Sequence, residues 1–418
     1  MQKNNTKQRR SRISISATVF AAALIVAGFV FSASVKTSGK VAAVETTEIW
    51  DGSVAVAFAG GNGTKSDPYL ISDGAEFAFF VEVINSGEEG YNTADIYYKL
   101  VNDIYLNDIS GWESWASFAN AEEAEAVGIK AWTPIGTGTS FRSNFDGAGH
   151  AVRGVYIHTR DNQQGLFGRV FGGSISNTGV EQSYIKGRDD VGGVAGVVGG
   201  GGQIINSYHA GEVVGMGSGA GGVAGNIYNS GITGSYNTGS VTGGSYVGGV
   251  AGHIFGGVIT GSYNTGKVAG TGTAAGGVAG AVFNTDDNDG RISDSYNIGN
   301  VTGGMSVGGV VGAVSGGSIV KCKNSGGVFG DYHVGGIAGM VMENGSLTDC
   351  NNEGNVTGEM NVGGIVGFII GNRLVKNCKN TGVVTGKSDG YIGCLGGTVA
   401  IVPVIAAAGF VLFKRKRG

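Results

Sequence analysis

The sequence has little proline and little charge for its length. Only 3 of its 418 residues are Pro and 14% are charged, whereas 83 are Gly. Collagen places glycine at every third position, and that period is absent, so the glycine excess does not indicate a triple helix. Apolar residues make up 41% of the chain, which is enough for a core and argues against wholesale disorder. We therefore expect glycine to serve the many tight turns of a repeat protein.

Basic residues are scarce between the two ends of the chain. Nine of the 28 Lys and Arg residues lie within residues 1–12 and 414–418, which leaves 19 basic against 32 acidic residues and a charge of −13 for the rest. A nucleic-acid-binding protein needs a basic patch. The composition therefore excludes nucleic acid as a partner.

The N-terminal residues have the form of a secretory signal. Residues 13–31 are almost wholly apolar and follow a basic segment. Small residues come next, and Ser32-Ala33-Ser34 offers a signal-peptidase site before Val35. We interpret residues 1–34 as a signal peptide. The alternative is an uncleaved N-terminal anchor, because the apolar run is long for a cleaved signal.

A second apolar segment lies near the C-terminus. Residues 392–413 carry no charge and precede a basic tail at 414–418. A helix of this length can cross about 30 Å of hydrocarbon, and positive residues stay on the cytoplasmic side. We therefore predict a transmembrane anchor at 392–413, a cytoplasmic tail, and a repeat region outside the cell. A buried hydrophobic strand or helix is the alternative. The ending resembles the tail of Gram-positive wall-anchored proteins, but residues 388–397 hold no sortase motif, so we expect simple membrane anchoring.

A glycine-rich motif of the form VGGVAG recurs along the chain. Its copies begin at residues 191, 220, 247, 275, 307, 334 and 362, with spacings of 27 to 32 residues, and degenerate copies begin at 163 and 392. The second half of each unit repeats equally well, with an apolar residue, then Ser or Cys, then Asn. The Ser or Cys column comprises Ser207, Ser235, Ser262, Ser295, Cys322, Cys350 and Cys378. The Asn column comprises His209, Asn237, Asn264, Asn297, Asn324, Asn352 and Asn380.

This period predicts an all-β, three-sided β-solenoid (β-helix). Each unit offers three short β-prone stretches between glycine turns, and no unit has the ten or more helix formers of a helical solenoid. We expect right-handed coils, about 4.8 Å apart, over residues 161–391, and the motif copies indicate eight or nine of them. Glycine is expected to supply positive φ at the corners. The Asn residues are expected to hydrogen-bond amide to amide between coils.

Residues 35–160 differ in composition and contain all four Trp. Within them, residues 74–87 predict an amphipathic helix with Ser72 and Asp73 as candidate caps. We interpret this region as a mixed N-terminal cap of the solenoid. The apolar face of the helix consists of Phe77, Phe80, Val81 and Ile84.

These motifs resemble those of bacterial surface proteins with GLUG-motif repeats. The similar segments are GLFG at 165–168, the GGVAG and GGIVG copies with their SYNxGxV partners, and the leader segments GGNGTKSDPYLIS, WTPIG and FDGAGH. The resemblance implies surface exposure and an adhesin-like or architectural role, and it supplies no catalytic residues. Similar repeats accompany some immunoglobulin-cleaving metallopeptidases, but their HExxH zinc motif is absent from this sequence.

One tyrosine column is the candidate binding site. Equivalent positions of four successive units carry Tyr, which could form an exposed aromatic strip for a glycan or a protein. The alternative is that these rings pack at a corner of the solenoid. The column consists of Tyr208, Tyr236, Tyr263 and Tyr296.

Three cysteines share another column, in consecutive units. A Cα separation near 4.8 Å would permit a disulfide between Cys322 and Cys350. We prefer the alternative, in which Cys replaces the Ser of earlier units as a small buried side chain, because three cysteines cannot all pair.

Residues 284–290, NTDDNDG, resemble part of a calcium loop. However, Tyr296 stands where an EF-hand needs Glu, so a solvated turn is the preferred interpretation. Polysaccharide lyases and hydrolases also use β-helices, which makes an enzyme the rival class. Hydrolases need paired carboxylates, and the repeat columns hold few acids. They are Glu212, Asp294, Asp349, Glu353 and Glu359.

From the sequence we expect a non-catalytic surface protein that binds or displays a ligand on its repeats, without a cofactor or metal. Its expected partners are the membrane, through residues 392–413, and a glycan or an extracellular protein. A structural envelope spacer and a carbohydrate-active enzyme are the alternatives.

Overall fold

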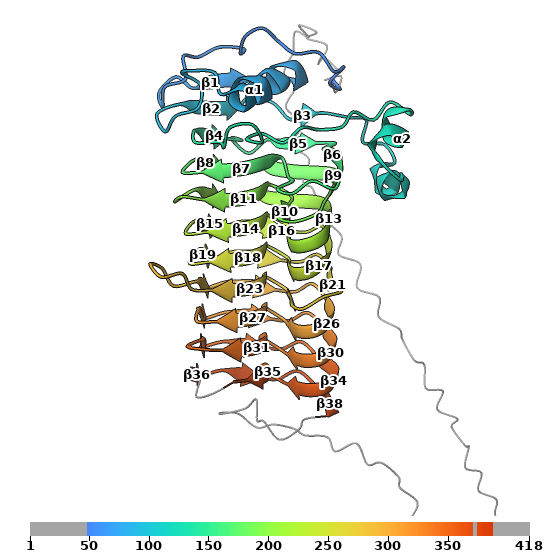
Figure 1. The fold of residues 1–418 in the computed structure, drawn as a ribbon, viewed down its shortest axis with the longest axis vertical. Coiled ribbons are helices and arrows are strands. Elements are labelled where there is room, and N and C mark those ends of the chain that lie inside the picture. Colours follow the sequence, from blue (N-terminus) through green and yellow to red (C-terminus); the bar gives the residue numbers. More distant parts are fainter. Residues whose placement is uncertain (1–47, 371–373, 388–418) are drawn as a thin grey trace, which may run out of the picture. The chain divides into compact units, whose positions relative to one another are not determined.

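The computed structural model describes residues 48–370 and 374–387, within a compact unit that begins at Thr47. Its named strands pair in parallel and stack into a β-solenoid of about eleven turns, with little helix (Figure 1). The prediction of an all-β solenoid is thereby confirmed, while its handedness and its number of sides stay predictions. The predicted signal peptide at 1–34 and anchor at 392–413 lie outside the described residues. Within the described ranges, no helix has the length and apolar character needed to cross a membrane.

The strands fall into three sheets. The 11-stranded sheet contains β1 (Tyr69–Ile71), β2 (Tyr97–Leu100), β4 (Asn144–Asp146), β8 (Ser174–Ser176), β12 (Gln203–Ile205), β15 (Gly231–Thr233), β19 (Val258–Thr260), β24 (Arg291–Ser293), β28 (Ser318–Val320), β32 (Ser346–Thr348) and β36 (Leu374–Lys376). The 8-stranded sheet contains β7 (Phe167–Phe171), β11 (Ala195–Gly199), β14 (Ala224–Tyr228), β18 (Ala251–Phe255), β23 (Ala279–Phe283), β27 (Val311–Ser315), β31 (Ala338–Met342) and β35 (Val366–Ile369). The 19-stranded sheet contains β3 (Ile104–Tyr105), β5 (Ala151–Arg153), β6 (Tyr156–His158), β9 (Gly179–Gly187), β10 (Val191–Gly192), β13 (Tyr208–Gly221), β16 (Tyr236–Asn237), β17 (Ser240–Gly248), β20 (Tyr263–Asn264), β21 (Val268–Gly270), β22 (Ala275–Gly276), β25 (Tyr296–Asn297), β26 (Val301–Gly308), β29 (Lys323–Asn324), β30 (Val328–Gly335), β33 (Asn351–Asn352), β34 (Val356–Gly363), β37 (Lys379–Asn380) and β38 (Val384–Lys387).

The apolar column of the repeat forms the centre of the core. In the 11-stranded sheet its side chains are stacked in register and fully buried from Ile175 to Leu347. The same column continues upstream, because Phe145 pairs with Ile175 and Tyr98 pairs with Phe145. The stack therefore has about eleven turns rather than the eight or nine predicted. The additional turns escaped the motif count because they lack its glycines.

The upstream coils are also interrupted by an excursion on the outside of the stack (Figure 1). It contains the 3₁₀ helix η1 (Trp112–Ser117) and the short helix α2 (Ala121–Glu125). Trp115 anchors this excursion by packing edge-on against the buried ring of Tyr156.

The N-terminal end is covered by α1 (Gly74–Ser86), the predicted amphipathic helix. The Asp73 side chain accepts a hydrogen bond from the amide of Glu76, whose own carboxylate accepts from Ser72, so both predicted caps are used. Phe77 stacks on Trp132 at 5.1 Å and Phe80 stacks on Phe145 at 5.7 Å, measured between ring centroids. The helix thus shields the first coil from water and from pairing with another strand.

The glycines of the VGGVAG motif are needed for space rather than for positive φ, which corrects the prediction for this motif. Gly248 and Gly249 do not have positive φ. A β-carbon on Gly249 would overlap the Gly277 carbonyl oxygen of the next coil and the amide carbon of Asn264. The left-handed corner positions are held by glycine in some coils, as by Gly219 at φ 81°, and by other residues in others, as by Tyr246 at φ 55° and Ser306 at φ 52°. The motif glycines, by contrast, face neighbouring backbone.

The Asn column forms a buried hydrogen-bonded ladder, as predicted. Each Nδ2 from Asn237 to Asn352 donates to the Oδ1 of the next Asn, at 2.7–2.9 Å. The same nitrogen donates to the carbonyl oxygen of the glycine two residues later in its own coil, as Asn264 does to Gly266. Both hydrogens of each side-chain amide are donated in hydrogen bonds. Burying this polar column therefore costs little free energy of folding.

His209 terminates this ladder at its N-terminal end. Asn237 uses its Nδ2 as a donor, so its Oδ1 must accept the hydrogen bond from His209 Nδ1 at 3.1 Å. His209 Nε2 then accepts from the hydroxyl of Ser183, also at 3.1 Å. The ring is fully buried, and burial lowers the pKa of His209 to about 4. The neutral ring is therefore the form that completes the ladder.

We predict that Gly249→Ala destabilises the fold strongly while Gly304→Ala does not. The first change forces backbone of adjacent coils apart and should cost about 3 kcal/mol or more of the free energy of unfolding. At Gly304 the nearest atom to a new β-carbon is 3.8 Å away, so this matched change should be neutral or stabilise by about 0.5 kcal/mol. Urea unfolding of both variants measures the difference, and similar losses would contradict a steric role for Gly249.

We predict that His209→Asn makes the protein more resistant to acid. Because the pKa of His209 is about 4 in the folded chain and 6.5 is its ordinary value, the unfolded chain takes up the proton first as the pH falls. The parent protein should lose about 3 kcal/mol of stability between pH 7 and pH 4 through this residue. The variant keeps all other titrating groups and should lack this loss. Parallel curves of unfolding free energy against pH would refute the assignment.

Candidate functional site

The four predicted tyrosines form one continuous stack, called here the tyrosine ladder. They lie at register positions of β13, β16, β20 and β25, one per coil. Neighbouring ring centroids are 4.8 Å apart and the ring planes differ by 1–4°. Strand alternation turns these residues outward, because their neighbours in the Ser and Asn columns face the core. The rings therefore lie on the outer face of the 19-stranded sheet.

The ladder is partly exposed. Its first three rings are half-buried, and Tyr296 at the C-terminal end is 39% exposed. Since the rings cover one another's faces, the stack presents ring edges rather than ring faces to solvent. Burial raises the pKa of Tyr236 and Tyr263, so these hydroxyls stay protonated and can both donate and accept hydrogen bonds.

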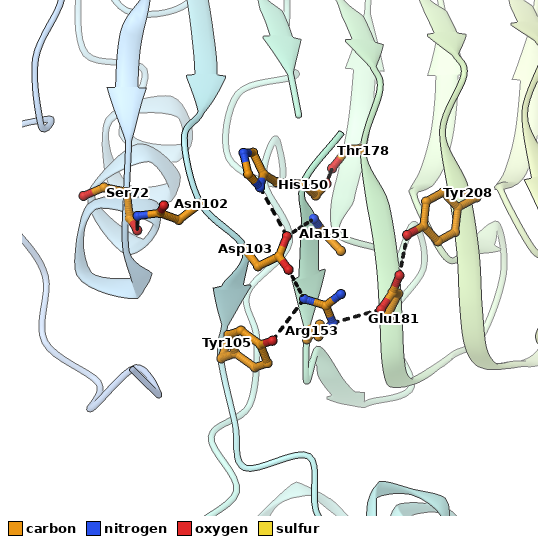
Figure 2. A network of polar contacts seen from close by, with 10 residues as sticks. All are labelled: Ser72, Asn102, Asp103, Tyr105, His150, Ala151, Arg153, Thr178, Glu181 and Tyr208. Atoms are coloured by element: carbon orange, nitrogen blue, oxygen red, sulfur yellow. Dashed lines mark hydrogen bonds and ion pairs between the residues drawn. The ribbon is translucent and has the colours of Figure 1, made fainter. Parts of the chain in front are cut away.

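A network of charged groups holds the N-terminal end of the ladder, and Figure 2 shows it. Tyr208 donates its hydroxyl hydrogen to Glu181, and Arg153 Nε donates to the other oxygen of that carboxylate at 2.9 Å. Arg153 also donates to Asp103, which accepts from the Ala151 amide at 3.0 Å. The Arg153 guanidinium lies 5.2 Å from the centre of the Tyr105 ring. We call Asp103, Arg153 and Glu181 the anchor network.

The anchor network fixes the charge state of its members. Partial burial alone would raise the pKa of Asp103, but hydrogen bonds from the Ala151 amide and Arg153 outweigh it and lower that pKa. Burial, reinforced by the Glu181 carboxylate, raises the pKa of Tyr208. The hydroxyl of the first ring is thus held protonated, as a hydrogen-bond donor to Glu181.

Sequence reasoning missed the anchor network. One signal could have found part of it, because Arg153 and Glu181 are 28 residues apart, which is the length of a repeat unit. They are register partners in β5 and β9. No such signal existed for Asp103, which lies 50 residues from Arg153 across the irregular excursion.

At the other end, the ladder is followed by a cation. Lys323 occupies the next register position after Tyr296, and its Nζ forms an ion pair with Glu353 at 2.8 Å. Glu353, one of the acidic residues noted in the sequence, is therefore paired with a lysine of the neighbouring coil. The tyrosine ladder thus lies between the anchor network at its N-terminal end and the Lys323–Glu353 ion pair at its C-terminal end.

The three cysteines of the Ser column are buried free thiols in the structure. Each repeats a hydrogen bond of the Ser that it replaces: Cys322 Sγ donates to the Val320 carbonyl, as Ser295 Oγ does to Ser293. Hydrogen bonding with Cys322, together with burial, raises the pKa of Cys350 to about 12. The arrangement matches the preferred interpretation, a small buried side chain.

The acidic insertion at 284–290 forms a loop between β23 and β24 that projects from the stack (Figure 1). Its polar groups bond to one another: Asn284 Nδ2 donates to Asp289 at 2.7 Å, and the Gly290 amide donates to Asn284 Oδ1 at 2.9 Å. Thr285 ties the loop to Asn229 of an earlier coil. These contacts are those of a hydrogen-bonded turn.

Comparisons with known proteins give partial likenesses. No family model matches the chain. Halomucin of Haloquadratum walsbyi is 29% identical over 38% of this chain, and a protein of Evansella cellulosilytica, provisionally named a Gly-rich membrane protein, is 33% identical over 31%. The chain spans only 2% and 12% of these relatives. A crystal structure from Bacteroides ovatus, of a protein provisionally named an immunoglobulin A1 protease, aligns with 79% of this chain and 87% of its own, at 22% identity and a TM-score of 0.48.

We predict that Arg153→Ala lowers the free energy of unfolding by about 1–3 kcal/mol, because it leaves two partly buried carboxylates without their shared partner. Arg188→Ala is the matched control, since Arg188 is 59% exposed and pairs with its neighbour Asp189. That change should cost no more than about 0.5 kcal/mol. Urea unfolding compares them, and equal effects would mean that the anchor network contributes no stability of its own.

Proposed function

We propose that this chain is a surface-exposed, non-catalytic rod, right-handed and three-sided, that binds a glycan or an extracellular protein along the tyrosine ladder. The N-terminal signal and the segment at 392–413 would place the solenoid outside the cell and attach it to the membrane. The names of the partial relatives, a halomucin and a membrane protein, agree with such a location. The resemblance to GLUG-repeat surface proteins points the same way.

The observation that carries the proposal is the regular, partly exposed stack of tyrosine rings. Hydroxyl groups repeat along the sheet at the coil spacing, and the next outward position adds Thr238 and Thr265 beside two of the rings. A polyhydroxylated chain or an extended peptide can exchange hydrogen bonds with several such groups at once. Tyrosine contributes contact area with little loss of side-chain entropy, especially when its ring is already fixed by stacking.

A structural envelope spacer and a carbohydrate-active enzyme are the competing functions. The spacer would need the same fold without a ligand. The enzyme would need an acid and a base that face one substrate. The experiment below separates all three.

We predict that the full-length chain, in detergent micelles, binds selectively on an array of glycans and extracellular matrix proteins. Replacing all four ladder tyrosines with Ser should reduce binding at least tenfold, because both contact area and fixed hydroxyls are lost. The control carries Phe329→Ser and Tyr332→Ser, two side chains of the same sheet with exposed fractions of 42% and 44%, and should bind normally. If the ladder variant binds as strongly as the parent, the binding site lies elsewhere on the protein. If the folded parent binds nothing on the array, the spacer function is favoured. Release of reducing sugar from array glycans would favour the enzyme.

A further inference from the structure

Three polar side chains from successive coils converge at a corner beside the 8-stranded sheet. Asp190 precedes β10, Asn226 lies in β14, and His253 lies in β18, where it is the register partner of Asn226. Asn226 Nδ2 donates to Asp190 Oδ1 at 3.3 Å. His253 Nδ1 lies 4.0 Å from the same carboxylate oxygen. None of these residues belongs to the tyrosine ladder or the anchor network.

Two atoms of this cluster have no hydrogen-bond partner among the described residues. His253 is only 8% exposed, yet its Nδ1 is buried without a hydrogen bond, and the Oδ1 of Asn226 is in the same condition. Native proteins rarely leave buried polar atoms unpaired, because each costs about 1–3 kcal/mol. His253 Nδ1 faces the Asp190 carboxylate, and Asn226 meets the same carboxylate through its amide nitrogen, so this arrangement points to a missing cation rather than to a missing anion.

The backbone leaves room at this place. The corner residue of the intervening coil is Gly219, with φ 81°. A β-carbon there would lie 2.8 Å from His253 Nδ1 and 2.9 Å from Asp190 Oδ1. The equivalent corner of the next coil carries Tyr246, whose ring packs 4.5 Å from that of His253 and closes one side.

The other ring nitrogen of His253 is already oriented. Its Nε2 lies 3.4 Å from the hydroxyl oxygen of Ser218. With hydrogen on Nε2 donated to Ser218, the lone pair of Nδ1 points toward Asp190. Metal-binding histidines are commonly fixed by such a second hydrogen bond.

The electrostatics of the corner also favour a cation. The Asp190 side chain is largely buried and lies near the carboxylate of Asp189. Asp189 itself pairs with Arg188 on the outside, whereas Asp190 pairs with no Lys or Arg of the described residues. A bound positive ion would compensate the charge of Asp190.

We propose that Asp190, Asn226 and His253 bind one divalent cation of the zinc class, with imidazole nitrogen, carboxylate oxygen and amide oxygen as ligands. Zn²⁺ takes such ligands at about 2.1 Å, which places tetrahedral ligands about 3.4 Å apart. The carboxylate–imidazole gap of 4.0 Å needs only a small closure, and a half-turn of the Asn226 amide presents its oxygen to the ion. The fourth position is left for water. The described residues contain no group of three His, Cys, Asp or Glu side chains placed for a metal, so the amide oxygen is an essential part of the set.

The test uses the full-length chain in detergent, freed of metal by a chelator. Co²⁺, a spectroscopic substitute for Zn²⁺, is titrated while visible absorption is recorded, and Zn²⁺ is added in a thermal unfolding experiment. We expect one ion per chain, a tetrahedral or five-coordinate Co²⁺ spectrum, and a Tm rise of several degrees with Zn²⁺. His253→Ala and Asp190→Asn should each weaken binding at least tenfold.

Two further variants keep the result interpretable if those changes disturb folding. Asn226→Asp should bind more tightly, because it replaces a neutral ligand with a carboxylate. His333→Ala is the control: it also removes a histidine whose Nδ1 is buried and without a partner, and it should bind as the parent does. Absence of binding by the folded parent, or unchanged binding by His253→Ala, would overturn the proposal. So would loss of the signal on His150→Ala, which would place the ion at the surface pair of His150 and Asp103.

Discussion

The stacking of this solenoid depends on backbone-to-backbone contact at three glycines in every unit. The first glycine of each VGG segment meets the carbonyl three residues later, the second meets a carbonyl of the next coil, and the glycine after Ala meets the backbone of the preceding coil, as in Gly248, Gly249 and Gly252. No larger residue fits at these places. The glycine excess in the composition is therefore a packing requirement, and the straight columns of side chains follow from the regular approach that it permits.

Columns that stack this regularly must also satisfy their buried polar groups, and two side-chain ladders do so. The Ser hydroxyls accept from the backbone amide of the preceding coil, as Ser235 does from Ser207 at 3.1 Å, and donate within their own coil. Along a parallel line, each Asn oxygen accepts from the side-chain amide of the preceding coil, and each Asn nitrogen also donates within its own coil. The narrow core is thus partly polar without unpaired groups along these lines. Outside the core, the same regularity brings the tyrosines into contact ring to ring.

Much of this could be predicted from the sequence, because a parallel solenoid converts sequence period into columns in space. The apolar, Asn and Tyr columns and the capped helix at 74–87 needed only the repeat and the side-chain alternation. The role of the glycines was misjudged, since sequence does not distinguish a residue needed for φ from one needed for space. The anchor network and the Asp190 cluster could not be predicted. Asp103 reaches its partner across an irregular excursion, and Asp190 meets Asn226 at a separation of 36 residues, which departs from the repeat.

The amide ladder has a direction, and this affects how such a gene can change in length. Every Asn donates toward the next coil, so each interior rung presents the same acceptor on one side and the same donor on the other. Unequal recombination can remove or add one whole interior unit. The Asn residues that then become neighbours present equivalent donor and acceptor atoms, so every hydrogen bond of the ladder can still form. His209 accepts from Ser183 instead of from an amide, so the array can lengthen or shorten by whole units only on the C-terminal side of that residue.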